Sequence, residues 1–223
     1  MNCFFPKSLS AKEAVQRQKL WADQVIQKKA FSRLNTIAGA DVAFSPDKKK
    51  AIAGVVLFSF PDLEEIERVQ AMKALTFPYV PGLLSFREGP VLCKAFSKLR
   101  HRVDLAVFDG HGLAHPRRMG IASHMGLALG IPSIGCAKSR LCGSFREPGR
   151  KRGSQSDLTL EKEVVGKVLR TRDGVRPIFV SIGHRIDLKN SVDIILRCHD
   201  GTRIPKPTRE ADHYVGSIKR KLS

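Results

Sequence analysis

The stretch IAGADVAF, residues 37–44, is followed by SPDKK, residues 45–49, and then by KAIAGVVLFSF, residues 50–60. The two flanking runs have the apolar composition of buried strands, and the Pro and Asp between them favour a turn. The stretch therefore predicts a β-hairpin that begins a sheet. Asp41 lies inside the first of these strands, where an unpaired carboxylate would cost several kcal/mol.

Helical and strand patterns alternate beyond this hairpin. Ser10 and Glu13 form a capping-box pattern, which predicts a helix over residues 11–30. A third strand is expected around Ala71–Leu75. Further strands are predicted at residues 104–108, 131–137 and 176–183, and further helices at residues 89–99, 121–130, 191–199 and 208–222. This order predicts an α/β fold, with a mixed sheet flanked by helices, in a single domain over residues 1–223.

One stretch has the composition of a loop. Residues 145–157, FREPGRKRGSQSD, are rich in Gly, Arg and Ser. We expect a mobile surface segment, which is either merely solvated or in contact with a phosphate backbone.

Charge is the dominant feature of the composition. Lys and Arg number 39 against 21 Asp and Glu, which gives a net charge of +18 and a pI near 10.1. Such an excess favours binding to polyanions such as nucleic acids, although ribosomal and membrane-surface proteins are basic too. The sequence contains no run of 18 apolar residues and no secretion signal, so we expect a cytoplasmic protein that does not enter membranes. The five cysteines form no CxxC pair and are expected to be reduced thiols: Cys3, Cys93, Cys136, Cys142 and Cys198.

Three aspartates stand at the edges of apolar runs. Asp41 lies in IAGADVAF, Asp109 follows the strand DLAVF, and Asp212 opens the last helical segment in PTREADHYV. A strand-end Asp by itself is more often a turn or cap residue. Two of them in a basic chain favour a cation site, because carboxylate oxygens are the ligands that Mg²⁺ and Mn²⁺ prefer. The pattern predicts a metal-dependent enzyme that acts on nucleic-acid phosphates.

Two further segments contain candidate nucleic-acid ligands. In DGHGLAHPRRMG, residues 109–120, His115, Arg117 and Arg118 accompany glycines that let a backbone approach a ligand closely. In PYVPGLLSFRE, residues 78–88, Tyr79 stands between Pro78 and Pro81 and is followed by Gly82. Prolines stiffen the loop, so the ring is suited to enter a base stack, unless the loop is only packing.

Two charged residues near these segments complete the candidates. Glu88 leads into a helix and is either a metal ligand or a helix-terminal acid stabilised by the helix dipole. Lys138, in CAKSRLCG, follows a predicted strand and either presents its ammonium group to a phosphate or is an ordinary surface lysine.

The order of these motifs resembles the endonuclease V family, the deoxyinosine 3′ endonucleases. The matching segments are DVAF, PYVPGLLSFRE, DGHGLAHPRRMGIASHMG, CAKSRLCG, GHRIDL and PTREAD, and they span roughly residues 10–220. Length and the compact ending resemble the bacterial branch of the family. The resemblance implies a ribonuclease-H-like fold and Mg²⁺-dependent nicking, with Mn²⁺ as a substitute, one nucleotide to the 3′ side of deaminated adenine.

Roles are carried over from the family to matching positions only. Asp41 and Asp109 match its metal-binding aspartates, Glu88 its active-site glutamate, Tyr79 its wedge tyrosine and Lys138 a lysine near the active site. At the last acidic position some family members have His, so Asp212 is favoured with His213 as the alternative.

The partners expected are inosine-containing DNA, with RNA as the alternative substrate, and the chain is expected to be a monomer. A competing hypothesis is a non-catalytic protein that binds lesions through the same basic surface and tyrosine. A requirement for added Mg²⁺ in strand cleavage distinguishes the enzyme from the binding protein.

Overall fold

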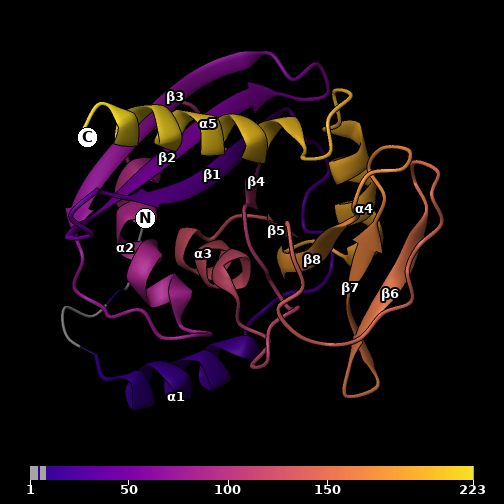
Figure 1. Cartoon of the computed structure of the whole chain (residues 1–223), viewed down its shortest axis with the longest axis horizontal. Coiled ribbons are helices and arrows are strands. Elements are labelled where there is room, and N and C mark those ends of the chain that lie inside the picture. Colours follow the sequence, from indigo (N-terminus) through magenta and orange to yellow (C-terminus); the bar gives the residue numbers. More distant parts are fainter. Residues whose placement is uncertain (1–4, 6–8, 223) are drawn as a thin grey trace.

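The computed structural model describes residue 5 and residues 9–222, and most of these residues belong to one mixed α/β unit (Figure 1). An eight-stranded sheet has the order β3-β2-β1-β4-β5-β8-β7-β6. Its strands are β1 (Thr36–Phe44), β2 (Lys50–Ser59), β3 (Glu65–Ala74), β4 (Leu105–Phe108), β5 (Ser133–Ala137), β6 (Gln155–Leu160), β7 (Glu163–Leu169) and β8 (Ile178–His184). The helices are α1 (Ala11–Ala22), α2 (Leu84–Phe96), α3 (Ile121–Leu129), α4 (Leu188–Arg197) and α5 (Lys206–Arg220).

The hairpin predicted from the first apolar runs is confirmed. β1 and β2 pair antiparallel, with Asp41 opposite Gly54. On its other edge β1 pairs parallel with β4, and β4 pairs parallel with β5. The remaining neighbours in the sheet pair antiparallel. The prediction of a mixed sheet flanked by helices is therefore confirmed.

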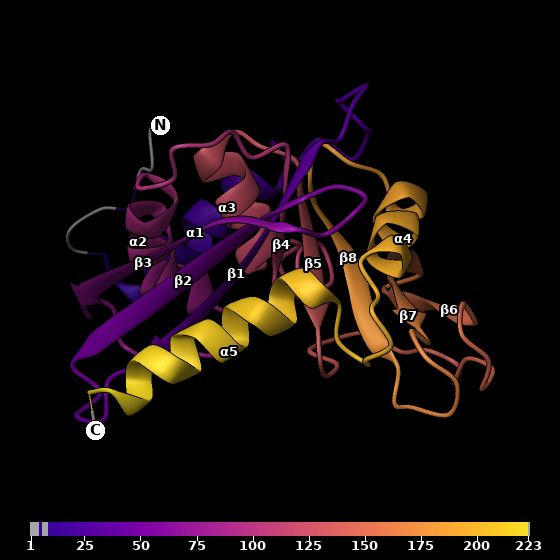
Figure 2. The same ribbon diagram turned by 90° about the horizontal axis from the view of Figure 1, so that it is seen from above.

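Helices cover both faces of the hairpin. α5 lies across β1 and β2 on one face, whereas α2 and α3 lie on the opposite face (Figures 1 and 2). Alternate residues of β2 pack into two different cores: Val55 and Leu57 face α2 and α3, and Val56 and Phe58 belong to the cluster on the α5 face. This explains why β2 is buried from Ala51 to Phe58 without a polar face.

The first helix is shorter than the sequence suggests. Its capping box is present, since the Ser10 N–H donates to Glu13 Oε2 at 2.8 Å and the Glu13 N–H donates to Ser10 Oγ at 3.3 Å. The helix nevertheless ends at Ala22, so the expected range of 11–30 is wrong in its second half. The following segment bonds to the end of β8 instead, where the Arg185 N–H donates to the Ile26 carbonyl and the Ala30 N–H donates to the Arg185 carbonyl.

Three further expectations need correction. The third strand is longer than expected, because β3 begins at Glu65 and pairs along the whole of β2. The antiparallel hairpin of β6 and β7 was not predicted. The loop expected over residues 145–157 ends at Ser154, because residues 155–157 belong to β6. Its mobility stays a prediction, although Arg170 donates hydrogen bonds to Gly149 O at 3.0 Å and Pro148 O at 2.9 Å within it.

Cysteine pairing differs from the expectation at one position. Cys136, Cys142 and Cys198 are free thiols, as expected, whereas Cys93 is disulfide-bonded. Cys3 lies outside the described residues. Within the part of the chain that is described, no helix is both long enough and apolar enough to cross a membrane.

A buried glutamate fastens β3 to the turn that follows α2. The Glu67 carboxylate accepts bonds from the Arg100 N–H at 3.1 Å, the His101 N–H at 3.2 Å and His101 Nδ1 at 2.9 Å. The bond from the His101 ring contributes most to lowering the pKa of Glu67 from 4.5 to about 2.

This shift predicts a pH-dependent contribution to stability. Because the folded-state pKa is below the unfolded value, the contribution is present above pH 4.5 and is lost as the pH falls towards about 2. We expect Glu67→Gln to have a lower free energy of unfolding than wild type at neutral pH, and the difference to shrink at acid pH. Urea denaturation at several pH values measures it. A difference that does not change with pH would contradict the assignment.

Candidate active site

Three carboxylates from distant parts of the chain meet beside β1. Asp41 comes from β1, Asp109 directly follows β4, and Asp212 comes from α5. Parallel pairing aligns Ala40 with Phe108, so that Asp41 and Asp109 are neighbours across the two strands. One carboxylate oxygen of each of the three residues lies within 4.8 Å of the others. The three aspartates therefore lie together, and their role as metal ligands stays a prediction.

Two glycines allow α5 to approach the hairpin closely. A Cβ at Gly39 would lie 1.8 Å from the Pro207 carbonyl oxygen, and a Cβ at Gly54 would lie 2.7 Å from a Val215 methyl group. Only a residue without a side chain fits at Gly39, because the atom opposite it belongs to the backbone of α5. This close contact brings Asp212, which is five residues beyond Pro207, to the two strand-borne aspartates.

Gly39→Ala is expected to disrupt the carboxylate group. The added methyl group collides with Pro207 and displaces the start of α5, at a cost of about 1–3 kcal/mol in stability. We expect a lower melting temperature together with weaker Mn²⁺ binding, both measurable on the purified protein. Gly216→Ala is the matched control, because it adds a methyl group within α5 whose nearest atom, Arg220 Nη1, would lie 3.6 Å away. An equal loss of Mn²⁺ binding in both variants would argue against the specific role of Gly39.

Lys138 neutralises part of this charge. Its Nζ lies 2.6 Å from Asp109 Oδ2 and 2.7 Å from Asp212 Oδ2. Partial burial lowers the pKa of Lys138, but its bonds to Asp109 and Asp212 outweigh this and raise that pKa above its ordinary value. The ammonium group is therefore charged at neutral pH and stands beside the carboxylates, and its expected role at a phosphate stays a prediction.

Glu88 lies near the group but is not part of it. It is buried in α2, and no oxygen of Glu88 joins the three that converge. Burial, and then the charge of Asp41, raises the pKa of Glu88 to about 8. Burial, and then the charge of Asp109, raises the pKa of Asp41 to about 7. Acidic groups that resist ionisation together accept a divalent cation readily, and hard oxygen ligands suit Mg²⁺ and Mn²⁺. The donor set therefore fits such a cation.

A small cavity opens next to these residues. It has a volume of about 200 Å³, below the roughly 300–1,000 Å³ typical of sites for drug-sized ligands. Its lining is formed by Gln18, Tyr79, Val80, Pro81, Gly82, Leu84, Ser85, Gly110, His111, His115, Met119, Gly120, Ile121 and Leu141. Gly110, one of the lining residues, directly follows Asp109 in the chain, which places one wall of the cavity beside the carboxylate group.

The predicted wedge stands at the edge of this cavity. Tyr79 is 70% exposed and Leu141 is 49% exposed, which is unusual for side chains of their size. Pro78 and Pro81, on either side of Tyr79, are exposed as well. A stiff, protruding ring of this kind has the geometry expected of a residue that stacks on a base.

Three donors hold the backbone of Gly82. Its carbonyl oxygen receives Gln18 Nε2 at 2.9 Å, His115 Nε2 at 3.0 Å and Arg117 at 2.8 Å. Gly82 has a φ of +76°, which favours glycine. Burial, and then the charge of Arg117, lowers the pKa of His115 to about 4, so the ring is neutral at pH 7. His115 lines the cavity, and together with Arg117 it fixes the Gly82 carbonyl at the cavity wall.

The two arginines expected to bind phosphate also make hydrogen bonds within the protein. Arg117 donates to Gln18 Oε1 at 2.6 Å in addition to Gly82. Arg118 donates to Glu163 at 2.8 Å and to the Leu160 carbonyl at 3.3 Å. A motif rich in arginine does not reveal these bonds, since the acceptors come from distant segments. Arg118 Nη1 is buried and has no hydrogen-bond partner among the described residues, so phosphate binding by the two arginines stays a prediction.

The structure also decides between two neighbours on α5 and adds a residue. Asp212 is in the carboxylate group, whereas His213 is exposed and is not. Gln18, which holds both the Gly82 and the Met119 carbonyls at 2.9 Å, was not anticipated. It lies on α1 among polar residues, and nothing in the local sequence marks it. Leu141 was also missed, although it lies within the CAKSRLCG motif.

Comparison with known proteins agrees with this geometry. The family model described as endonuclease V matches residues 18–213. Endonuclease V of Dictyoglomus thermophilum is 46% identical over 209 residues, which cover 93% of this chain and 90% of the relative. The crystal structure of endonuclease V from Streptomyces avermitilis superposes with a TM-score of 0.92 at 36% identity, over the whole of both chains.

A third match has nucleic acid bound. It is a crystal structure of Ciona intestinalis endonuclease V in complex with a 24mer DNA that contains an inosine followed by a ribo-adenosine. The two chains are 28% identical with a TM-score of 0.83, over 93% of this chain and 97% of the other. The ribonuclease-H-like fold and the family expected from the motifs are confirmed. The chain belongs to the endonuclease V family of nucleases.

Proposed function

We propose that this nuclease is a Mg²⁺-dependent phosphodiesterase, with Mn²⁺ as a substitute, that nicks a DNA strand one nucleotide to the 3′ side of inosine. The observation that carries the proposal is the group formed by Asp41, Asp109 and Asp212 next to a nucleobase-sized cavity. The Ciona relative binds inosine-containing DNA, which supports inosine as the feature recognised.

Asp41, Asp109 and Asp212 would hold the cation through their converging oxygens. When bound, the cation would lower the pKa of the attacking water and stabilise charge on the phosphate. Lys138 contributes a fixed positive charge beside the reacting phosphate. Glu88, buried near Asp41, adds a further carboxylate and is the least directly placed of the four proposed acidic ligands. No serine or cysteine nucleophile is required.

The cavity would receive the inosine base after it leaves the helical stack. Extrusion costs a few kcal/mol and is easiest at a weakly paired base. Tyr79, exposed at the edge of the cavity, would stack in the gap that remains. His115 and Gly82 line the cavity and would contact the nucleic acid there, and the net charge of +18 attracts the backbone of the strand.

Two alternatives are separated by experiment. One is an inosine-directed ribonuclease, and the other is a protein that binds the lesion without cutting it. The carboxylate group argues against pure binding, because acidic groups repel phosphate unless a cation intervenes. A cytoplasmic location, a monomeric state and a role in DNA repair are further parts of the proposal.

The decisive assay uses matched oligonucleotides. Strands with and without a single inosine, as DNA and as RNA, are incubated with the protein in EDTA, Mg²⁺ or Mn²⁺, and cleavage products are mapped to the nucleotide. We expect nicking of inosine-containing DNA one nucleotide to the 3′ side, only with added metal. Faster cutting of inosine-containing RNA would support the ribonuclease instead. Binding without any cleavage would support the non-catalytic protein.

A further inference from the structure

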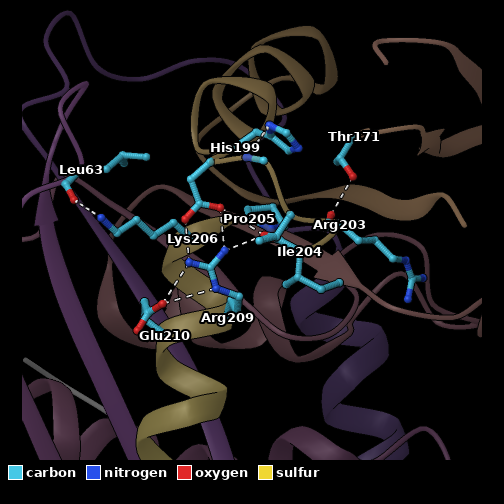
Figure 3. A network of polar contacts seen from close by, with 12 residues as sticks. Leu63, Thr171, His199, Arg203, Ile204, Pro205, Lys206, Arg209 and Glu210 are labelled. Carbon is cyan, nitrogen blue, oxygen red and sulfur yellow. Dashed lines mark hydrogen bonds and ion pairs between the residues drawn. The ribbon is translucent and has the colours of Figure 1, made fainter. Parts of the chain in front are cut away.

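The loop that joins α4 to α5 is tied firmly to the start of α5. Residues 198–205 form this loop, which we call the α5 entry loop. Arg209 donates to both carboxylate oxygens of Asp200, each at 2.6 Å. Figure 3 shows Arg209 with the labelled residues around it. The Lys206 N–H donates to the Cys198 carbonyl at 2.9 Å, and Lys206 Nζ reaches the Leu63 carbonyl at 2.9 Å. These bonds link the entry loop to α5, the helix that contains Asp212.

Arg203, in the middle of this loop, extends its side chain towards the end of β5. Its guanidinium donates to three backbone carbonyls: Lys138 at 2.8 Å, Pro177 at 2.9 Å and Arg176 at 2.9 Å. Its own carbonyl accepts a bond of 2.6 Å from Thr171 Oγ1, and Thr171 is fully buried (Figure 3). Arg203 is thus fixed at its backbone and at its side chain.

The sheet itself does not hold Lys138. The pairing of β5 with β8 ends at Ala137 opposite Phe179, and the pairing of β5 with β4 ends at Gly135. Lys138 therefore lies beyond both ladders. The planar fork of an arginine donates to several carbonyls in a fixed geometry, which the flexible ammonium group of a lysine does not reproduce. Arg203 therefore binds the backbone of the first residue that the sheet hydrogen bonds of β5 no longer reach.

We propose that Arg203 is a positioning residue that holds Lys138 in place relative to Asp212. One side chain connects the backbone of Lys138 to the loop that enters α5, so the 2.7 Å contact between Lys138 Nζ and Asp212 Oδ2 depends on it. Arg203 does not itself touch the carboxylate group, because its described bonds go to carbonyls. The inference rests on the proposed function, in which Lys138 acts at the phosphate.

The test compares Arg203→Met and Arg203→Lys with wild type in single-turnover nicking of an inosine-containing DNA oligonucleotide. Displacement of a reacting group by about 1 Å costs on the order of 10²-fold in rate. We expect a loss of about that size in both variants, with unchanged affinity for the oligonucleotide in EDTA. Arg176→Met is the matched control, because Arg176 is exposed and close to Arg203. The substitution removes a positive charge but keeps the guanidinium group of Arg203 and the Arg176 carbonyl to which it donates.

A double-mutant cycle with Lys138→Met separates positioning from general destabilisation. If Arg203 acts through Lys138, Arg203→Met slows nicking no further once Lys138 is absent. Independent, multiplicative losses in the double variant would overturn the proposal, and so would a wild-type nicking rate in Arg203→Met. Should Arg203→Met fail to fold by circular dichroism, Thr171→Val removes only the bond to the Arg203 carbonyl and is expected to show the same coupling at smaller size. If wild type does not nick, the proposed function fails rather than this inference.

Discussion

Asp109→Ala is expected to abolish nicking while leaving the binding of inosine-containing DNA intact or tighter. The variant removes one of the three converging oxygens and also one of the two partners of Lys138. A lost cation ligand costs several kcal/mol of transition-state stabilisation, or about 10³-fold in rate. Binding persists because the removed carboxylate repelled phosphate. Nicking is measured with saturating Mg²⁺, and binding by fluorescence anisotropy in EDTA.

The matched control for this prediction is Asp62→Ala. Asp62 is exposed and lies outside the carboxylate group, so its removal makes the same change in net charge. We expect it to nick like wild type. Asp41→Ala should reproduce the loss seen with Asp109→Ala, because both residues offer an oxygen to the same point. Nicking by Asp109→Ala within a few-fold of wild type would exclude the metal assignment.

Tyr79→Ala is expected to weaken binding of the lesion strand without affecting the carboxylate group. The ring is 70% exposed beside the cavity, so the folded protein gains little from it. Stacking of a base on an aromatic ring contributes about 1–3 kcal/mol, which corresponds to an affinity loss of about 5–150-fold. Mn²⁺ binding should be unchanged, because Tyr79 supplies no ligand. The preference for inosine-containing over undamaged strands should fall as well.

Tyr79→Phe is the control that keeps the ring and removes only the hydroxyl group. It should bind the lesion strand as wild type does, since stacking uses the face of the ring. The melting temperature of Tyr79→Ala should remain that of wild type. If Tyr79→Ala binds and cuts the inosine strand normally, the ring serves packing alone and the wedge assignment is wrong.

Prediction of the fold from the sequence succeeded where periodicity was strong. β1, β2, β4, β5 and β8 are short apolar runs, and such runs identify buried strands reliably. The hairpin of β6 and β7 was missed because Gln155–Leu160 is polar and only Leu158 is fully buried in it. α1 was predicted too long because nothing local ends it. The segment after it bonds to the end of β8 instead: the Ile26 carbonyl accepts from the Arg185 N–H, and the Ala30 N–H donates to the Arg185 carbonyl.

Three of the four acidic residues predicted at the site lie together, whereas Glu88 is not in the group. Asp41, Asp109 and Asp212 converge as expected, since a carboxylate at the end of a buried strand requires a partner. The bonds of Arg117 and Arg118 to other parts of the protein were not predicted, because residue type shows which bonds a side chain can make but not which acceptors lie within reach. Gln18 and Arg203 act on carbonyls of distant segments, and no local pattern marks them.

By itself the sequence determined the spacing of apolar residues along the chain, the basic net charge and the kinds of side chains available for chemistry. These are properties of short segments or sums over residues, so they do not depend on how distant parts of the chain pack together. Only the tertiary structure decided that α5 crosses β1 closely enough, over Gly39, to bring Asp212 to Asp41 and Asp109. It also decided that Lys138 stands between two of these carboxylates. Distances between residues far apart in the chain depend on how the whole sheet and its helices pack, because hydrogen bonds and ion pairs act only within a few ångströms.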